Sequence, residues 1–265
     1  MNHYAAMYLV VGDEFCLRES CEALVKEGVE MFFFLFPLHY WNGEQVPKGK
    51  RDEVRAIMKD LPKKRMVEVI PPGSKPLAEQ EAIVRNYCMT QMVMAGYKGA
   101  LIVDGDEIWQ PGTLAAIDVV VNDKHPAVSI PSLNIVGFPG YPVVGNQEGL
   151  LVYARSDNKF VYGRSTEKGP AFTDCPSLIH FTSTRRTMEE TILKHRLSCH
   201  YRESDYDFEG WLKDVLPRIK PGAKISHMFK RWNVWKEVRY FTHEEWDLIP
   251  QRLHAYLGGP PDVSA

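Results

Sequence analysis

The feature that most constrains the fold is a regular alternation of short apolar runs and amphipathic segments over the first 110 residues. The apolar runs cover residues 5–11, 29–36, 66–70 and 100–103. Between them, apolar side chains recur at helical spacing over residues 17–28, 52–61 and 77–95. Runs that are apolar at successive positions are typical of strands buried on both faces. The alternation therefore predicts an α/β fold, with a mostly parallel sheet flanked by helices and right-handed crossovers.

The composition is that of an ordinary globular chain. It has 265 residues, 45% of them apolar, and a formal net charge of −2, which excludes a disordered chain and a polycation that binds nucleic acid by bulk charge. No apolar run approaches the ~20 residues that cross a bilayer, and the first residues lack the basic region of a signal peptide. The five cysteines form no C-x-x-C pair. We therefore expect a cytoplasmic protein with reduced thiols and no membrane span.

The fourth apolar run leads directly into Asp104-Gly105-Asp106-Glu107. Three carboxylates this close repel one another unless a positive charge lies between them. Mg²⁺ or Mn²⁺ can supply that charge, because these ions bind one or two carboxylates together with phosphate oxygens. A solvated acidic turn is the alternative interpretation, since Asp and Gly are frequent in turns. The position at the carboxyl end of a strand, where α/β sheets bind ligands, favours the metal site.

Four segments follow one another in an order and spacing that match a known enzyme family. They are MYLVVGDEFCLRESCEALVKEGVEMFFFLF, VRNYCMTQMVMAGYKGALIVDGDE, LIVDGDEIWQPGTL and SLIHFTSTRRTMEETILKHRLSCHY. The first segment resembles a first strand, acidic turn, helix and second strand of that family. The second resembles a helix with an Arg-Asn pair before the metal motif, and the third resembles the D-x-D metal segment itself. The fourth resembles a later strand that ends near His and Ser. Together they cover roughly residues 5–210 and resemble the glycosyltransferases of the GT-A type, in particular the family-2-like enzymes.

The resemblance implies a GT-A type, Rossmann-like fold and the transfer of a sugar from a nucleoside-diphosphate sugar, with a UDP-sugar as the expected donor. Mn²⁺ or Mg²⁺ would act as a Lewis acid on the departing diphosphate. The residues implied in donor binding are Asp13, Glu14, Arg85, Asn86, Asp104, Lys194 and His200. Those implied in metal binding are Asp104, Asp106 and His180. Taken alone, Arg85 would be interpreted as a solvated helix residue and His180 as a hydrogen-bonded core histidine.

The catalytic base is less clearly marked than the donor site. An inverting transferase needs a carboxylate that takes the proton of the acceptor hydroxyl, whereas a retaining one does not require it. The candidates are Asp174, Asp205 and Asp207, the last two in the acidic stretch 203–209. None matches the family pattern closely, so the stereochemical outcome stays open, and a solvated acidic loop is the alternative for this stretch.

The segment 218–240 is basic and aromatic. It contains seven basic residues and one acidic residue, a balance of 7 − 1 = +6. Basic groups neutralise phosphates and aromatic rings stack on bases or sugars, so the candidate acceptor surface is Lys230, Arg231, Trp232 and Trp235. The alternative is an ordinary C-terminal segment that packs its tryptophans on the domain and leaves its charges in solvent.

These observations predict a catalytic domain over residues 1–215, with a nucleotide-sugar half to about 110 and an acceptor half over about 111–215. Residues 216–265 are predicted to form a helical or irregular extension. The acceptor suggested by the basic tail is a 5-hydroxymethylpyrimidine in DNA, as in phage DNA-modifying transferases. A glycan, a lipid or a small molecule are alternative acceptors. A sugar nucleotidylyltransferase and a nucleic-acid-binding module without catalysis are the rival functions.

Overall fold

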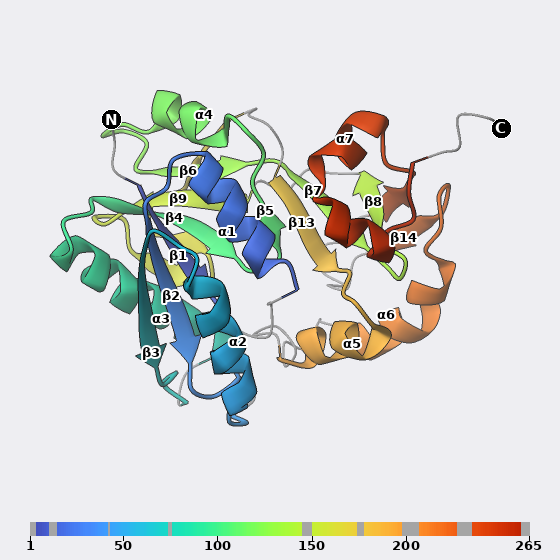
Figure 1. Cartoon of the computed structure of the whole chain (residues 1–265), viewed down its shortest axis with the longest axis horizontal. Coiled ribbons are helices and arrows are strands. Elements are labelled where there is room, and N and C mark those ends of the chain that lie inside the picture. Colours follow the sequence, from blue (N-terminus) through green and yellow to red (C-terminus); the bar gives the residue numbers. More distant parts are fainter. Residues whose placement is uncertain are drawn as a thin grey trace. The chain divides into compact units, whose positions relative to one another are not determined.

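The computed structural model of the chain describes residues 4–10, 15–41, 43–73, 76–144, 150–173, 178–197, 207–226 and 235–260 (Figure 1). By its internal contacts the chain divides into two compact units. Unit 1 contains Met1–Pro131, Gly149–Leu178 and Leu197–Cys199. Unit 2 contains Ser132–Glu148, Ile179–Arg196 and His200–Ala265.

Unit 1 is built on a sheet with the strand order β12-β6-β9-β4-β1-β2-β3. Its strands are β1 (Ala5–Leu9), β2 (Met31–Pro37), β3 (Lys63–Val69), β4 (Gly99–Asp104), β6 (Ala127–Ile130), β9 (Leu150–Arg155) and β12 (Ala171–Phe172). Neighbouring strands pair in parallel except at β9, which is antiparallel to both β4 and β6. The predicted α/β class, with a mostly parallel sheet flanked by helices, is therefore confirmed, and the antiparallel β9 is an addition that makes the sheet mixed.

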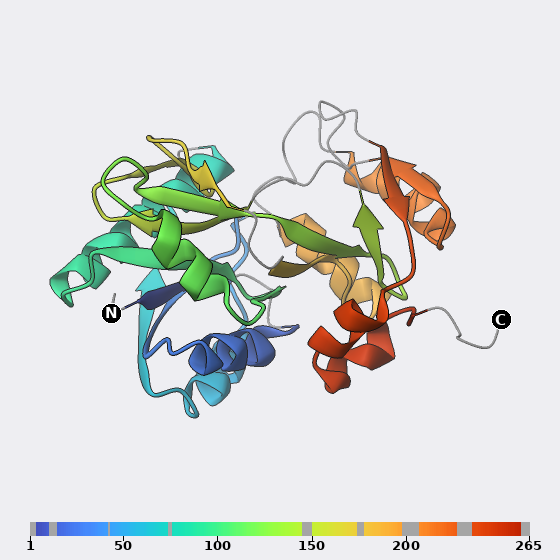
Figure 2. The same ribbon diagram turned by 90° about the horizontal axis from the view of Figure 1, so that it is seen from above.

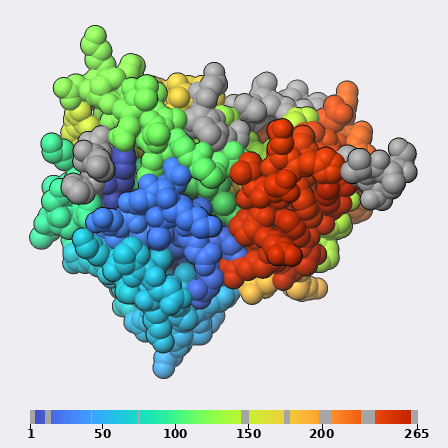
Figure 3. Space-filling model, turned by 45° about the horizontal axis from the view of Figure 1, so that its top comes forward, coloured from blue at the N-terminus to red at the C-terminus, as the bar shows by residue number. Residues whose placement is uncertain are grey.

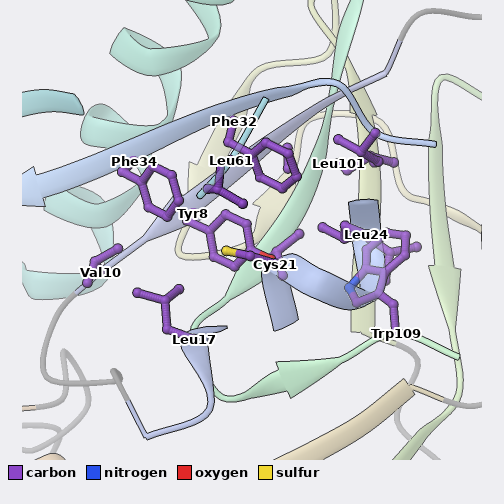
Figure 4. Close-up of a cluster of buried hydrophobic side chains, with 14 of the residues drawn as sticks. Tyr8, Val10, Leu17, Cys21, Leu24, Phe32, Phe34, Leu61, Leu101 and Trp109 are labelled. Carbon is purple, nitrogen blue, oxygen red and sulfur yellow. The ribbon is translucent and has the colours of Figure 1, made fainter. Parts of the chain in front are cut away.

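Helices cover both faces of this sheet (Figures 1 and 2). They are α1 (Leu17–Lys26), α2 (Lys48–Met58), α3 (Leu77–Met94) and α4 (Thr113–Val120). Side chains such as Tyr8, Phe32 and Phe34 pack in one core with residues of α1, α2 and α4 (Figure 4). Their neighbours Met7 and Phe33 point to the other face and pack with α3. The uninterrupted apolar runs in the sequence thus reflect strands that are buried on both sides. In the space-filling view, α1 and α2, in blue, lie at the surface of unit 1 (Figure 3).

The order in which strands are added to the sheet reverses at β1. From β1 the connections lead outward through α1 to β2 and through α2 to β3, and α3 then returns to β4 on the other side of β1. In open α/β sheets, ligands bind beyond the carboxyl ends of the strands at such a reversal. The carboxyl end of β4 is Asp104, so the acidic segment lies at this position.

Unit 2 has a sheet in which β14, β15, β8, β7 and β13 follow one another. These strands are β7 (Ser132–Val136), β8 (Tyr141–Val144), β13 (Leu178–Ser183), β14 (Lys224–Ser226) and β15 (Trp235–Val238). The helices are α5 (Met188–Leu197), α6 (Phe208–Asp214) and α7 (His243–Leu248), with 3₁₀ turns η1 (Leu216–Arg218) and η3 (Gln251–Tyr256). The extension from residue 216 was predicted to be helical or irregular, and this was wrong in part because β14 and β15 add to the sheet next to β8.

One further segment differs from what its sequence pattern predicts. The sequence of residues 128–135 is typical of one strand, but these residues form β6 and β7 in two different sheets, separated at Pro131. Proline lacks the N–H that a continuous ladder would require. The strands β6, β9 and β12, which follow residue 110, belong to the sheet of unit 1, and the predicted domain bounds at residues 110 and 215 stay a prediction. None of the helices in the described ranges is both long and apolar enough to cross a membrane.

The start of α4 provides a test of how unit 1 is held together. The carboxylate of Glu27, just after α1, accepts hydrogen bonds from the backbone N–H groups of Gly112 at 3.0 Å and Leu114 at 3.3 Å. Replacing Glu27 by Ala should lower the free energy of unfolding by about 1 kcal/mol, as loss of an N-terminal cap does. Urea denaturation measures this free energy. The control is Glu22→Ala, at an exposed position of α1. Equal stability of the two variants would contradict the capping role.

Candidate functional site

The acidic segment after β4 is folded into unit 1. Asp104 ends β4, Gly105 and Asp106 form a turn, and Glu107 begins β5 (Glu107–Ile108). Asp106 is 1% exposed and Glu107 is fully buried. The carboxylate of Glu107 accepts a hydrogen bond from the backbone N–H of Asp104 at 3.1 Å, and the Cys16 thiol donates to the Gly105 carbonyl at 3.4 Å. The alternative of a solvated acidic turn is therefore wrong.

Arg85 of α3 supplies one positive charge to this segment. Its side chain is buried, and Nη2 lies 2.9 Å from Glu81 Oε1 and 3.0 Å from Asp104 Oδ1. Glu81 stands four residues earlier in the same helix, which is the spacing at which helical side chains meet. The interpretation of Arg85 as a solvated helix residue is therefore wrong. Its Nη1 atom is buried and has no hydrogen-bond partner among the residues that the structure describes.

Arg164 supplies the second positive charge, and no sequence motif pointed to it. It lies in the hairpin of β10 (Phe160–Tyr162) and β11 (Ser165–Thr166). Its Nη1 contacts Asp104 Oδ2 at 3.1 Å and also donates to Glu107 Oε1. Its Nη2 donates to the carbonyls of Ile102 at 3.0 Å and Leu151 at 2.6 Å. The repulsion between Asp104 and Glu107 is thus balanced by a guanidinium of the protein, where the sequence had suggested a metal ion.

Asn86 holds this hairpin against α3. Its Nδ2 donates to the carbonyl of Phe160 at 2.8 Å, and its Oδ1 accepts from the N–H of Phe160 at 2.9 Å. A further backbone bond joins Gly163 N–H to the carbonyl of Ala78 at 2.8 Å. Asn86, predicted to bind the donor, is therefore engaged by backbone, and it orients the hairpin that carries Arg164.

The four carboxylates Glu81, Asp104, Asp106 and Glu107 are here called the acidic cluster. Three of them, Glu81, Asp104 and Glu107, contact the guanidiniums of Arg85 or Arg164. The charge of Asp106 acts on Asp104 and raises its pKa. Burial raises the pKa of Asp104, but Arg164 and Arg85 outweigh it, so the pKa is lowered and the carboxyl is ionised. Burial also dominates at Glu107 and raises its pKa to about 7, although Arg164 lowers it. Burial lowers the pKa of Arg164, but Glu107 and Asp104 raise it by more, so this side chain stays charged.

This arrangement sets limits on how a metal could bind. Within the described ranges, no group of three or more His, Cys, Asp or Glu side chains could hold a metal ion. Each oxygen of Asp104 already contacts a guanidinium, Oδ1 that of Arg85 and Oδ2 that of Arg164. Mg²⁺ in nucleotide sites usually takes only one or two protein carboxylates and completes its shell with phosphate and water. The predicted metal role of Asp104 and Asp106 therefore stays a prediction.

The remaining predicted residues of unit 2 are engaged as follows. His180 Nδ1 lies 3.1 Å from Asn134 Oδ1, which also accepts from the Thr182 hydroxyl at 2.9 Å. The predicted metal role of His180 stays a prediction. Lys194 donates from Nζ to the Thr182 carbonyl at 3.0 Å. Asp207 accepts a hydrogen bond from Gly210 N–H at 3.0 Å and caps α6. Its role as catalytic base stays a prediction.

Other predicted site residues lie outside the described residues. They are Asp13, Glu14, Asp174, His200, Asp205, Lys230, Arg231 and Trp232. Trp235 is the first residue of β15. Within the basic tail, Arg239 forms an ion pair with Glu245, with Nη1 2.7 Å from Oε2. Part of the tail's positive charge is therefore neutralised by a carboxylate that follows the segment.

Comparison with known proteins adds little to this geometry. No protein-family model matches the chain, and no curated protein matches it. Among solved structures, 31 chains match. One is described as the "Structure of the inositol-1-phosphate CTP transferase from T. maritima", with 15% identity, a TM-score of 0.34, and coverage of 59% of this chain and 69% of that chain. A likeness this low carries no conclusion about activity or substrate.

The raised pKa of Glu107 predicts a pH dependence of stability. In the folded protein Glu107 binds a proton up to about pH 7, whereas in the unfolded chain it releases the proton near its ordinary value of 4.5. Its contribution to stability is therefore complete below 4.5 and is lost as the pH rises through 7. Urea denaturation with chelator present should show this decline in the wild type and a flatter profile in Glu107→Gln. The same decline in both proteins would show that another group titrates.

Proposed function

We propose that this chain is a metal-dependent glycosyltransferase that moves a sugar from a nucleoside-diphosphate sugar to an acceptor hydroxyl. The observation that carries the proposal is the buried acidic cluster at the carboxyl end of β4, beside the strand where the sheet reverses. Nucleotides bind at this place in α/β sheets. The order of the four quoted segments and their resemblance to GT-A type enzymes support the same activity and the GT-A form of the fold.

The charges of the cluster favour a cation over a free anion as the first partner. With Glu107 near half-protonation at neutral pH, the four carboxylates still outweigh the two guanidiniums. The net negative charge of the cluster would therefore repel a bare phosphate. A cation such as Mn²⁺ or Mg²⁺, bound together with a diphosphate, would offset this repulsion. Asp106 would hold the cation, which when bound supplies Lewis-acid stabilisation of the leaving diphosphate.

The protein's own residues have distinct parts in this proposal. Arg85 and Arg164 keep Asp104 ionised, so that it can accept hydrogen bonds from hydroxyl groups of the donor. Arg85 Nη1 and Arg164 Nε are buried donors without a hydrogen-bond partner among the described residues. Buried donors of this kind are costly, and an oxygen of a bound ligand would satisfy them. The catalytic base stays open, with Asp174, Asp205 and Asp207 as the candidates.

A panel of nucleotides tests the donor class. Thermal unfolding is followed with UDP, GDP, their sugars, and CTP, each with and without Mn²⁺. Stabilisation by a nucleoside-diphosphate sugar that requires Mn²⁺ is the expected result, because a ligand that binds only the folded state raises its stability. Stabilisation by CTP alone would favour the nucleotidylyltransferase alternative. No stabilisation by any member would contradict the proposal.

Replacing Asp106 by Asn tests the metal role directly. The variant should lose the Mn²⁺-dependent stabilisation by the donor and nearly all sugar transfer or donor hydrolysis, while its unfolding without ligands stays cooperative. Asp52→Asn, an exposed residue of α2, is the matched control and should behave as the wild type. Turnover by a folded Asp106→Asn protein at the wild-type rate would show that Asp106 does not bind the metal.

The acceptor is a separate question, and DNA containing a 5-hydroxymethylpyrimidine is our proposal for it. Binding through a basic surface should weaken steeply as salt rises, because counterions are released from the DNA. Fluorescence anisotropy with duplex DNA should show this slope, and the Lys230→Ala, Arg231→Ala double variant should reduce it. Absence of binding at low salt would leave the glycan, lipid and small-molecule acceptors.

A further inference from the structure

We propose that the outer face of α3 is a docking surface for a second copy of this chain, with the two helices packed antiparallel across a two-fold axis. The surface consists of Ile83, Tyr87, Thr90 and Met94, here called the outer stripe. The same helix contributes Arg85 to the acidic cluster from its buried side. The outer stripe is therefore separate from the residues to which we assign the proposed function.

The outer stripe is a continuous line on an exposed helix surface, at the outside of one face of the sheet of unit 1 (Figure 1). Its residues recur at intervals of four, three and four, which places them on one side of the helix. Ile83, Tyr87 and Met94 are 42%, 49% and 76% exposed. The Thr90 hydroxyl is turned to its own helix, where it donates to the Asn86 carbonyl at 3.1 Å. Single exposed apolar side chains are common, but an apolar line of this length is typical of a helix that packs on a partner.

The charges of α3 lie away from the outer stripe. The structure describes every residue of this helix, and the charged side chains beyond its first turn, Glu81 and Arg85, are buried and paired with each other. Two more charges stand at the ends, Glu79 in the first turn and Lys98 just after the helix. An apolar surface with one negative and one positive end is complementary to a second copy of itself that runs in the opposite direction. The dipoles of two antiparallel helices favour the same arrangement.

The spacing of the outer stripe fixes how two copies would meet. In a two-fold contact, each residue lies opposite the residue that is equally far from the axis on the other side. An axis midway between Tyr87 and Thr90 sets these two residues opposite each other. The same axis sets Ile83 opposite Met94, because this pair is centred on the same point of α3. It also brings the negative end of each helix to the positive end of the other.

The hairpin of β10 and β11 extends this surface beside the first half of α3. The bond from Gly163 N–H to the Ala78 carbonyl, at 2.8 Å, holds it there, and its residues Val161 and Tyr162 are exposed. In the antiparallel arrangement they would lie toward the second half of the other helix, where Val93 is exposed. A surface of one helix and a short hairpin corresponds to the small interfaces, below about 1,200 Å² in total, that hold weak complexes. We therefore expect a reversible dimer.

Sedimentation velocity over a series of protein concentrations tests the proposal. The wild type should shift from monomer toward dimer as its concentration rises. Ile83→Lys should raise the dissociation constant on the order of a hundredfold, because each dimer would contain two unpaired charges against apolar side chains. Met94→Glu should have the same effect. Val119→Lys is the matched control, since Val119 is an exposed apolar residue of α4 in the same unit, and it should dimerise as the wild type does.

The double variant Ile83→Lys, Met94→Glu tests the direction of packing. Within one helix the two positions are about 16 Å apart, so their new charges do not pair inside a chain. Across the proposed axis each new charge lies opposite one of the other sign. The double variant should therefore regain most of the dimer that either single variant loses, and salt should weaken this recovery. Thermal unfolding followed by circular dichroism establishes that each variant is folded.

Each outcome supports or overturns the proposal. A wild type that stays monomeric at every concentration would overturn it. A dimer that withstands both single substitutions would also overturn it, because such a dimer would use another surface. Failure of the double variant to regain the dimer would contradict the antiparallel arrangement. None of these results bears on the Mn²⁺-dependent stabilisation by a donor, so the dimer and the proposed function can fail separately.

Discussion

The pairing of buried carboxylates with two guanidiniums is the interaction on which the rest of unit 1 depends. An ionised carboxylate inside a protein is tolerated only when a partner charge and hydrogen bonds replace its water. Asp104 obtains both from Arg85 and Arg164, one on each oxygen. Removing either arginine would leave a buried negative charge, and this requirement fixes where α3 and the β10–β11 hairpin must lie relative to β4.

The two arginines differ in what else they hold. Arg85 is tied within its own helix to Glu81, so its position follows from the path of α3. Arg164 is tied to the backbone of β4 and β9 and lies in a hairpin that Asn86 fastens to α3. Helix and hairpin are thus coupled through neighbouring residues of α3, Arg85 and Asn86. A shift of this helix would move both positive charges relative to the acidic cluster.

The sequence predicted the sheet of unit 1 well because its signals are local. Uninterrupted apolar runs such as 31–36 indicate strands covered on both faces, and the structure has β2 there. Asp104 and Asp106 were found because adjacent carboxylates are visible in the sequence. The antiparallel pairing of β9 was not predicted, since an apolar run does not reveal which strand it pairs with. The break at Pro131 was not predicted either, because the apolar residues on both sides of it suggested one strand.

The hydrogen-bond and ion-pair partners of Arg164, Asn86 and Asp207 were not predicted from the sequence. Arg164 has no motif, and only the demand for a positive charge beside Asp104 and Glu107 could have pointed to such a residue. Asn86 fits a family pattern by residue type, yet its amide bonds the backbone of Phe160. Asp207 stood in an acidic stretch, and its spacing to Gly210 at a helix start was a sign of a cap. In each case the partner, rather than the residue type, decides the role.

The place of Arg164 along the chain has a consequence for the order of folding. It lies 57 residues after Glu107 and 60 residues after Asp104. The parallel core from β1 to β4 can form from residues that precede it, but the cluster at the end of β4 cannot be neutralised until the hairpin has docked. Closing a loop of this length costs conformational entropy, which the contacts of Arg164 with Asp104 and Glu107 must offset. Full neutralisation of the carboxylates after β4 therefore requires that the strand and the hairpin are both in place.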